Sequence, residues 1–241
     1  KEIDTLKRAD AIVTVSESWA RGLRNRYGDK VSVVTNAYDP DYFSRIPLES
    51  GDRFAITYLG KLNSAHQDLS DFLGAVKKIL DDGKIPAVKI SVDFYTAGYG
   101  KPDISGLAAS MGLSGIVKEH SPVPFGRALE LMKNSSLLLV AGWKGQSSPG
   151  WRPQKVYEYM GSGIPIMLIN GIENTELRSM LASCKNCIVA DGARDIENGL
   201  LGAYSEFNKA DGIIRREAPA EYSIDKVTEG LCGIIEKMVR K

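Results

Sequence analysis

The stretch that decides the fold covers residues 142–169 and reads GWKGQSSPGWRPQKVYEYMGSGIPIMLI. It opens with a loop rich in glycine, serine and proline that leads to Pro153. Proline suits the first position of a helix because the amide hydrogen that it lacks would be unbonded there. Gly161 and Gly163 can supply the turn that ends the helix, and the apolar run 164–169 is typical of a buried strand. A loop, a helix and a buried strand in succession predict one unit of an α/β fold.

The predicted helix after Pro153 has two different faces. One face carries apolar side chains at positions i, i+3 and i+4, the spacing of a stripe that packs on a core: Val156, Tyr159 and Met160. The opposite face carries polar side chains that are free to contact a ligand: Gln154, Lys155 and Glu158. The helix start offers unbonded amides and a partial positive charge, which suit a diphosphate. Glu158 lies about 7.5 Å further along the axis than Pro153, so its carboxylate can accept hydrogen bonds from the ribose of the same ligand.

Helices and strands alternate through most of the chain. The predicted apolar strands are 54–59, 88–97, 116–119, 137–140 and 187–190. The predicted amphipathic helices are 68–80, 103–111, 125–133, 173–182, 196–208 and 223–239, the last with Ser223 as its N-cap. Alternation of helices with buried strands indicates βαβ units. The predicted fold class is therefore α/β, with a doubly wound, Rossmann-like parallel sheet covered on both sides.

The first part of the chain predicts a strand at 11–15, a helix at 17–27 and a strand at 31–34. Asp39 and Asp41 follow as a D-x-D pair, and two carboxylates can share one divalent cation. Metal-binding pairs of this kind end a strand, whereas this pair lies in a linker rich in turn formers. We therefore predict helix capping or simple solvation for the pair.

The composition of the 241-residue chain is that of an ordinary soluble protein, with 43% hydrophobic and 25% charged residues. The 31 basic and 30 acidic residues give a net charge of +1, which does not support a nucleic-acid partner. No apolar run approaches the ~20 residues of a membrane span, and no signal peptide opens the sequence. The sequence predicts a cytoplasmic protein without a transmembrane segment.

The chain contains three cysteines, an odd number that argues against a disulfide framework. Cys184 and Cys187 have the C-x-x-C spacing of redox and zinc sites, but no second pair accompanies them, and His66 and His120 are distant in sequence. Cys187 also opens the apolar run 187–190. We therefore predict a small buried side chain at a strand start.

Residues 153–169 resemble the donor-site segment of family 4 of the retaining nucleotide-sugar glycosyltransferases, which have the GT-B fold of two facing Rossmann-like domains. The segments ADAIVTVS at 9–16 and VSVVTNAYD at 31–39 resemble the end of that family's N-terminal domain, although Ala37 stands where glycine is common. The resemblance covers nearly the whole chain, and it implies that most of an N-terminal domain, about 150 residues, is missing from it. It implies three parts: the tail of the N-terminal domain with a linker at 1–47, the donor-binding domain at 48–222, and a helix at 223–241 that crosses back to the N-terminal domain.

The resemblance also implies roles for individual residues. In the family, the glutamate that matches Glu158 binds the ribose, and a strand that ends in glycine and a basic residue, here Gly60 and Lys61, brings a cation to the diphosphate. Lys61 is the predicted catalytic group, because it would stabilise charge on the leaving phosphate without a metal or another cofactor. The predicted donor-binding residues are Gly60, Lys61, His120, Ser121, Gly150, Trp151, Arg152, Pro153, Gln154, Lys155 and Glu158.

The sequence departs from the family at several of these contacts. His66 stands where a second basic residue is usual, so the phosphate clamp is weaker or is completed by another residue. Gly150 stands where many members carry a glutamate that contacts the sugar, and that contact must then come from backbone amides at 150–152 or from the missing domain. Ser121 replaces a glycine in the loop that reads the base, and His120 beside it either contacts the base or is a satisfied loop histidine.

The implied activity is transfer of a sugar, with retention, from a nucleotide-diphosphate donor of the UDP, GDP or ADP type. The acceptor, a glycan or a lipid-linked glycan, would be bound by the missing domain, which could also associate with a membrane. The chain alone is expected to be inactive, since half a cleft cannot exclude water. Trp143 and Trp151 either stack on the base or sugar or cover the edge of the core.

Two other functions stay open. One is a nucleotide-sugar epimerase of the same fold, and the other is a non-catalytic module that binds a nucleotide sugar or a partner protein. A dinucleotide fingerprint is disfavoured, because Gly98 and Gly100 would need a third glycine where the chain has Asp103.

Overall fold

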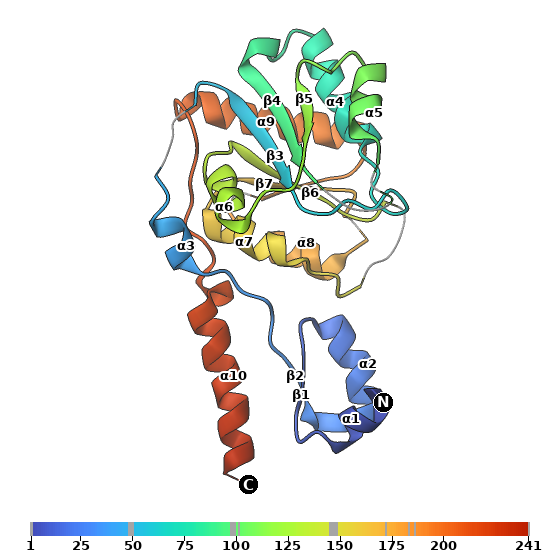
Figure 1. Ribbon diagram of the computed structural model, residues 1–241, viewed down its shortest axis with the longest axis vertical. Coiled ribbons are helices and arrows are strands. Elements are labelled where there is room, and N and C mark those ends of the chain that lie inside the picture. The colour runs from blue at the N-terminus through green and yellow to red at the C-terminus, as the bar shows by residue number, and fades with distance from the viewer. Residues whose placement is uncertain are drawn as a thin grey trace.

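The computed structural model describes residues 2–47, 51–96, 100, 102–144, 149–171, 173–182, 184, 185 and 187–240. Its main part is a six-stranded sheet in the order β5-β4-β3-β6-β7-β8 (Figure 1), and every neighbouring pair is parallel. The strands are β3 (Phe54–Leu59), β4 (Ile90–Tyr95), β5 (Val117–His120), β6 (Leu137–Ala141), β7 (Ile166–Ile169) and β8 (Cys187–Ala190). This topology confirms the predicted doubly wound α/β class.

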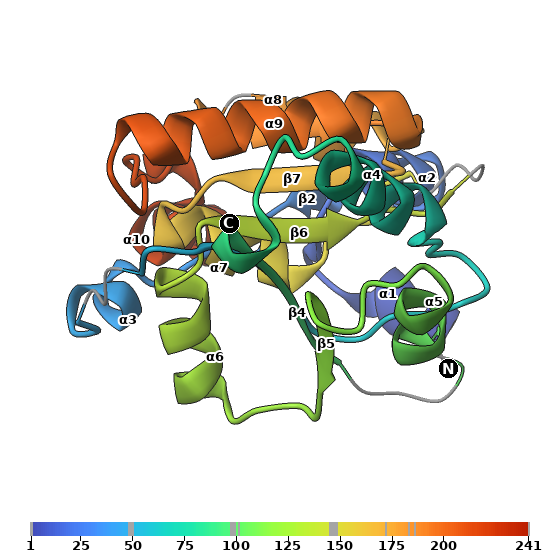
Figure 2. The same ribbon diagram turned by 90° about the horizontal axis from the view of Figure 1, so that it is seen from above.

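Helices cover both faces of the sheet. Successive residues of a strand point to opposite faces, and Leu138 and Leu139 of β6 accordingly belong to different hydrophobic cores. One core is shared by α4 (Ser70–Asp81), α5 (Ile104–Ser110) and α9 (Gly192–Lys209). The other is shared by α6 (Phe125–Lys133), α7 (Gln154–Ser162) and α8 (Thr175–Ala182). In Figure 1, α9 lies above the sheet with α7 and α8 below it, and Figure 2 shows α9 running alongside β7.

The order of the strands reverses between β3 and β6. These two strands pair only at Ile56 and Thr57 of β3, so they separate towards their carboxyl ends. The amide of Gly60 donates to Tyr95 O on the β4 side (3.0 Å), and the amide of Leu59 therefore faces the gap on the β6 side. It donates there to the hydroxyl of Tyr159, a fully buried side chain of α7 (2.9 Å). This bond anchors α7 at the reversal point, where ligands bind in open α/β sheets.

We expect Tyr159→Phe to lower the free energy of unfolding by about 1–3 kcal/mol, because the buried amide of Leu59 would lose its acceptor. Urea denaturation followed by circular dichroism measures the change. Tyr204→Phe is the matched control, since the half-buried Tyr204 hydroxyl makes no hydrogen bond to any described residue. Equal stabilities of the two variants would show that the hydroxyl of Tyr159 contributes nothing.

A small unit precedes the sheet. It consists of α1 (Glu2–Arg8), β1 (Ile12–Thr14), α2 (Glu17–Tyr27), a 3-10 turn (Gly28–Lys30) and β2 (Val31–Val33). β1 and β2 pair in parallel as a separate two-stranded sheet with its own core around Ala20. In the linker that follows, α3 (Pro40–Ser44) starts after Asp39, whose carboxylate accepts from the amide of Asp41 (2.9 Å). The predicted capping role of this pair is confirmed.

The last helix, α10 (Ile224–Val239), follows a 3-10 turn (Ala220–Tyr222) and extends away from the sheet (Figure 1). Ser223 caps it as predicted, accepting from the amide of Lys226. None of its residues is buried, and its exposed apolar side chains include Leu231, Ile235 and Met238. No helix in the described part of the chain has the length and apolar character that a membrane crossing requires.

Some predicted boundaries differ from the structure. β4 is shorter than the predicted strand 88–97, because residues 87–89 form a 3-10 turn (Ala87–Lys89). Pro153 is the extended residue that caps α7 and not its first helical residue. Cys187 does open β8 as predicted, but its side chain is half-buried and not buried, because β8 is the edge strand of the sheet. The thiol of the buried Cys184 lies 3.4 Å from the sulfur of Met160. Gly98 of the dinucleotide pattern lies outside the described residues.

Candidate functional site

Two cavities meet where β3 and β6 diverge. The first has a volume of about 360 Å³ and lies between the end of β3, α6 and the side of α7. The second, of about 700 Å³, lies between the end of β3 and the start of α7. Gly60, Lys61 and Lys155 line both cavities, so these three residues form the junction between them. A ligand that fills both cavities must pass this junction.

Gly60 allows the backbone to come close to α7. Its φ is +118°, a conformation that residues with side chains rarely adopt, and a Cβ here would lie 3.3 Å from Nζ of Lys155. Lys61 follows with an exposed side chain, and among the described residues this ammonium has no ion-pair partner. Lys61 is therefore available to an anionic ligand.

Lys155 extends from the first turn of α7 towards β3. Its ammonium lies 3.8 Å from the centre of the Tyr58 ring and donates to the Tyr58 hydroxyl (2.5 Å). That hydroxyl in turn donates to the carbonyl of Lys61 (2.7 Å). Burial lowers the pKa of Lys155 to about 7, although the nearby charge of Glu158 opposes this shift.

Glu158 is half-buried and lines the first cavity one turn after Lys155. Burial raises the pKa of this carboxyl above its usual range, while a hydrogen bond from Gln154 and the charge of Lys155 act in the opposite direction. Val156, Tyr159 and Met160 are buried as predicted, and Tyr157, which the stripe did not include, is fully buried as well. The predicted core face of α7 is therefore present, and the polar side chains Gln154, Lys155 and Glu158 line the two cavities.

The start of α7 opens into the second cavity. Pro153 and Gln154 line it together with Trp143 and Trp151. The first backbone bond of the helix runs from the amide of Val156 to the carbonyl of Pro153 (3.0 Å), so the amides of Gln154 and Lys155 precede the helical ladder. Free amides at a helix start can bind an anion.

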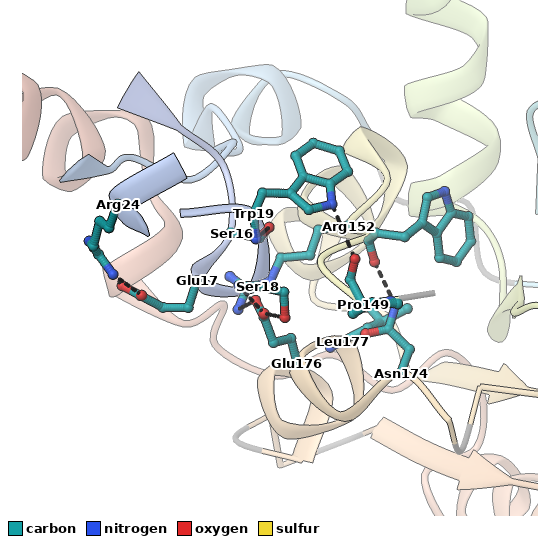
Figure 3. Close-up of polar contacts among 11 residues, drawn as sticks. Ser16, Glu17, Ser18, Trp19, Arg24, Pro149, Arg152, Asn174, Glu176 and Leu177 are labelled. Carbon is teal, nitrogen blue, oxygen red and sulfur yellow. Dashed lines mark hydrogen bonds and ion pairs between the residues drawn. The ribbon is translucent and has the colours of Figure 1, made fainter. Parts of the chain in front are cut away.

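The loop before α7 contacts the small N-terminal unit (Figure 3). Trp19 of α2 donates to the carbonyl of Pro149 (3.1 Å). Gly150 has a φ of +78°, and a Cβ at this position would lie 2.5 Å from Oγ of Ser16. Arg152 pairs with Glu176 of α8 (2.9 Å). The predicted sugar contacts at Gly150 and Arg152 thus face α2 and Glu176, and only Trp151 of this trio lines a cavity.

The predicted base contacts lie beside the first cavity and do not line it. His120 at the end of β5 bonds to Asp93 (2.7 Å) and stacks on Tyr95, with ring centres 4.4 Å apart. The structure therefore places His120 as a satisfied histidine, the alternative that the sequence left open. Neither His120 nor Ser121 lines the cavity, whereas the next two residues of the loop, Pro122 and Val123, do.

His66 does not occupy the position of a second phosphate-binding cation. It stacks on Trp143 with ring centres 4.3 Å apart, and its Nδ1 is buried without a partner among the described residues. Lys155 is the cation beside Lys61 instead. Within the described ranges, no group of three or more His, Cys, Asp or Glu side chains is placed to hold a metal ion.

Sequence reasoning missed the tyrosines that shape the junction. Tyr58 holds Lys155, and Tyr95 forms part of the wall of the first cavity. Tyr58 lies near the carboxyl end of β3, which flanks the reversal point, and Tyr95 ends the neighbouring strand β4. A position at the carboxyl ends of strands near the reversal point is the signal that would have found them. Glu176 was also missed, since nothing near it in sequence points to α2.

No protein-family model matches the chain, and no curated protein matches it. Solved structures do match. HepE of Anabaena, in complex with UDP-glucose, matches at 12% identity with a TM-score of 0.71, over 98% of this chain and 66% of HepE. A glycosyltransferase from Rickettsia africae matches at 13% identity with a TM-score of 0.70, over 96% of this chain and 64% of that one. WaaG, a glycosyltransferase involved in lipopolysaccharide biosynthesis, matches at 14% identity with a TM-score of 0.60, over 80% of this chain and 53% of WaaG.

These similarities show the fold. The chain has the Rossmann-like architecture of a GT-B glycosyltransferase domain, as predicted from the sequence. It spans about half to two thirds of the length of the structures it matches.

Proposed function

We propose that the chain is the donor-binding part of a retaining glycosyltransferase of family 4. It binds a nucleotide-diphosphate sugar, and a glycan or a lipid-linked glycan accepts the sugar on a facing domain. Residues 1–47 belong to that facing domain and the linker, residues 48–222 bind the donor, and residues 223–241 cross back. Cytoplasmic location and a role in polysaccharide biosynthesis belong to the same proposal, and the latter is supported by the similarity to WaaG.

One observation carries the proposal: a cationic junction separates two cavities of different character. Glu158 stands in the first cavity and can accept from a ribose diol, while apolar side chains of α6 can contact a base. The second cavity, with Trp143, Trp151 and the start of α7, has room for a sugar. The diphosphate then lies at the junction, next to Lys61. This order of groups is that of a nucleotide sugar.

In the proposed reaction, the bond between the anomeric carbon and the diphosphate oxygen breaks, and the electron pair leaves with the diphosphate. An acceptor hydroxyl oxygen forms the new bond to the anomeric carbon and gives up its proton to a base. Lys61 and the amides of Gln154 and Lys155 stabilise the charge that develops on this leaving group. No metal is required, because these groups supply the positive charge. Acid or base groups and the acceptor site belong to the facing domain.

We expect one of UDP, GDP and ADP to raise the thermal stability of the 241-residue chain. A ligand that binds only the folded state adds RT ln(1 + [L]/Kd), about 2.7 kcal/mol at a hundredfold excess over Kd. A thermal-shift panel with millimolar nucleotide measures this, and inorganic sulfate at equal ionic strength is the control. No shift with any of the three nucleotides would contradict the donor-binding role.

Two other functions are compatible with nucleotide binding. An epimerase would use similar donor contacts, and a binding module would hold the nucleotide sugar without reaction. A radiolabelled nucleotide sugar supplied with acceptor extract to a protein that contains both facing domains separates them. Label in the acceptor supports transfer, an altered free sugar nucleotide supports an epimerase, and an unchanged donor supports a binding module.

A further inference from the structure

Lys155 occupies the single place that both cavities share on α7. Its ammonium faces Gly60, and a Cβ at Gly60 would lie 3.3 Å from it. The residue lines the cavity that contains Glu158 and also the cavity that contains Trp143 and Trp151. A ligand with its ribose at Glu158 and its sugar in the second cavity therefore carries its diphosphate past this ammonium.

The described surroundings of Lys155 provide no directly paired counter-charge, although the charge of Glu158 acts on it from a distance. Its hydrogen bond goes to the neutral hydroxyl of Tyr58 on β3. The other titratable groups that line the cavities beside it are Lys61 after β3, Tyr95 on β4 and Glu158 on α7, while α6 contributes only apolar side chains. No carboxylate of the described residues lies within ion-pair distance of the Lys155 ammonium. The half-buried amine of Lys155 can therefore pair with an anionic group of a bound ligand.

On the basis of the proposed function, we infer that Lys155 is the second cation that binds the diphosphate, together with Lys61, and that it takes up a proton when the diphosphate binds. Lys155 thereby does the work of the basic residue that the family usually has at the position of His66. Its amine is held by an acceptor that serves both of its protonation states, since the Tyr58 hydroxyl uses its own proton on Lys61 O. The arriving diphosphate supplies the negative charge that makes the protonated form favourable.

The pKa of Lys155 supports this sequence of events. Burial lowers it to about 7 in the unliganded protein, so above that pH most of the amine is neutral. Because the ligand binds the protonated form, the contribution of Lys155 to nucleotide affinity should be present below pH 7 and should be lost as the pH rises past it. In the complex the pKa is higher, and the difference appears as proton uptake.

Calorimetry of the 241-residue chain at pH 8, in two buffers with different ionisation enthalpies, measures this uptake directly. The ligand is whichever of UDP, GDP and ADP binds tightest. Its terminal phosphate has a pKa of about 6 and is already ionised at pH 8, so it contributes little. We expect uptake of close to one proton per bound nucleotide. Lys155→Met should take up no proton at pH 8 and should bind the nucleotide at least tenfold more weakly at pH 6. Lys77→Met, on the exposed face of α4, is the control and should match the original protein in proton uptake and in affinity.

Each result of this experiment is decisive. Binding without proton uptake by the original protein overturns the inference and leaves the proposed function standing. Uptake that persists in Lys155→Met also overturns it, because another group would be the source. Absence of binding by all three nucleotides at pH 6 and pH 8 overturns the proposed function, and the inference falls with it.

Discussion

Glu158→Ala is expected to weaken nucleoside-diphosphate binding about tenfold to a hundredfold, while the protein stays folded. A hydrogen bond to a charged group contributes about 1.5–3 kcal/mol, and each 1.4 kcal/mol is about a factor of ten in affinity. The side chain is half-buried in the first cavity, where it accepts a hydrogen bond from Gln154 of the same helix. The loss should therefore appear in ligand affinity and not in the free energy of unfolding.

Titration with the nucleotide and its 2′-deoxy analogue tests the assignment. The original protein should bind the 2′-deoxy analogue more weakly than the nucleotide. Glu158→Ala should bind the two ligands with equal affinity, because the partner of the 2′-hydroxyl is already gone. Glu130→Ala is the matched control, since Glu130 is an exposed acid on α6 paired with Arg127 (2.6 Å). Equal losses on deoxygenation in both proteins would show that Glu158 does not contact the ribose.

The same carboxylate sets the acidic limit of binding. Burial raises the pKa of Glu158, and the ionised carboxylate accepts from a diol with both oxygens, whereas the protonated form uses one oxygen as a donor. Affinity should therefore fall as the pH drops through this raised pKa. Together with the decrease above the pKa of Lys155, at about 7, the affinity should follow a bell-shaped curve.

The fold was predictable because local patterns determine it. Buried strands and amphipathic helices alternate along the chain, and a parallel sheet is the arrangement that buries both faces of such strands. The two faces of α7 followed from the helical period alone, as the burial of Val156, Tyr159 and Met160 shows. The place of Gly60 and Lys61 near α7 was implied by the family resemblance, and the structure does bring the end of β3 next to Lys155.

The orientation of loop side chains was not predictable from local pattern. Gly150 and Arg152 lie directly before α7, and their place in the sequence suggested that they contact the ligand. In the structure, Gly150 lies against Ser16 and Arg152 pairs with Glu176. His120 bonds to Asp93 of the neighbouring strand rather than lining the cavity. In each case the partner is distant in sequence, and only the packed chain determines which of several nearby polar groups is reached.

Glu176→Ala is expected to lower the free energy of unfolding by about 3–5 kcal/mol, the cost of leaving one member of a buried ion pair without its partner. Only 13% of the Arg152 side chain and 15% of the Glu176 side chain are exposed. The other carboxylate oxygen of Glu176 accepts from the amide of Ser18 (2.6 Å) and also from its hydroxyl. Removing the carboxylate therefore leaves Arg152 unpaired and the amide and hydroxyl of Ser18, in the first turn of α2, without their acceptor (Figure 3).

Denaturation with urea measures the loss, and hydrogen exchange at the Ser18 amide reports on the contact itself. Glu176→Gln should lie between the original protein and Glu176→Ala, because an amide oxygen can still accept from Ser18 but does not neutralise Arg152. Glu173→Ala, an exposed acid just before α8, is the control. A Glu176→Ala protein as stable as Glu173→Ala, with unchanged exchange at Ser18, would contradict the expected role of this contact.

The nucleotide affinity of Glu176→Ala should change much less than its stability. Trp151 carries the loop into the second cavity, and its carbonyl is held independently by the side chain of Asn174 (2.7 Å). The junction residues Gly60 and Lys155 make no contact with Glu176, and effects at separate sites are additive to within about 0.5 kcal/mol. Affinity measured well below the melting temperature should therefore stay within about threefold of the original. A larger loss would mean that α2 controls the shape of the second cavity, and that contact between the N-terminal unit and the loop is needed to bind the donor.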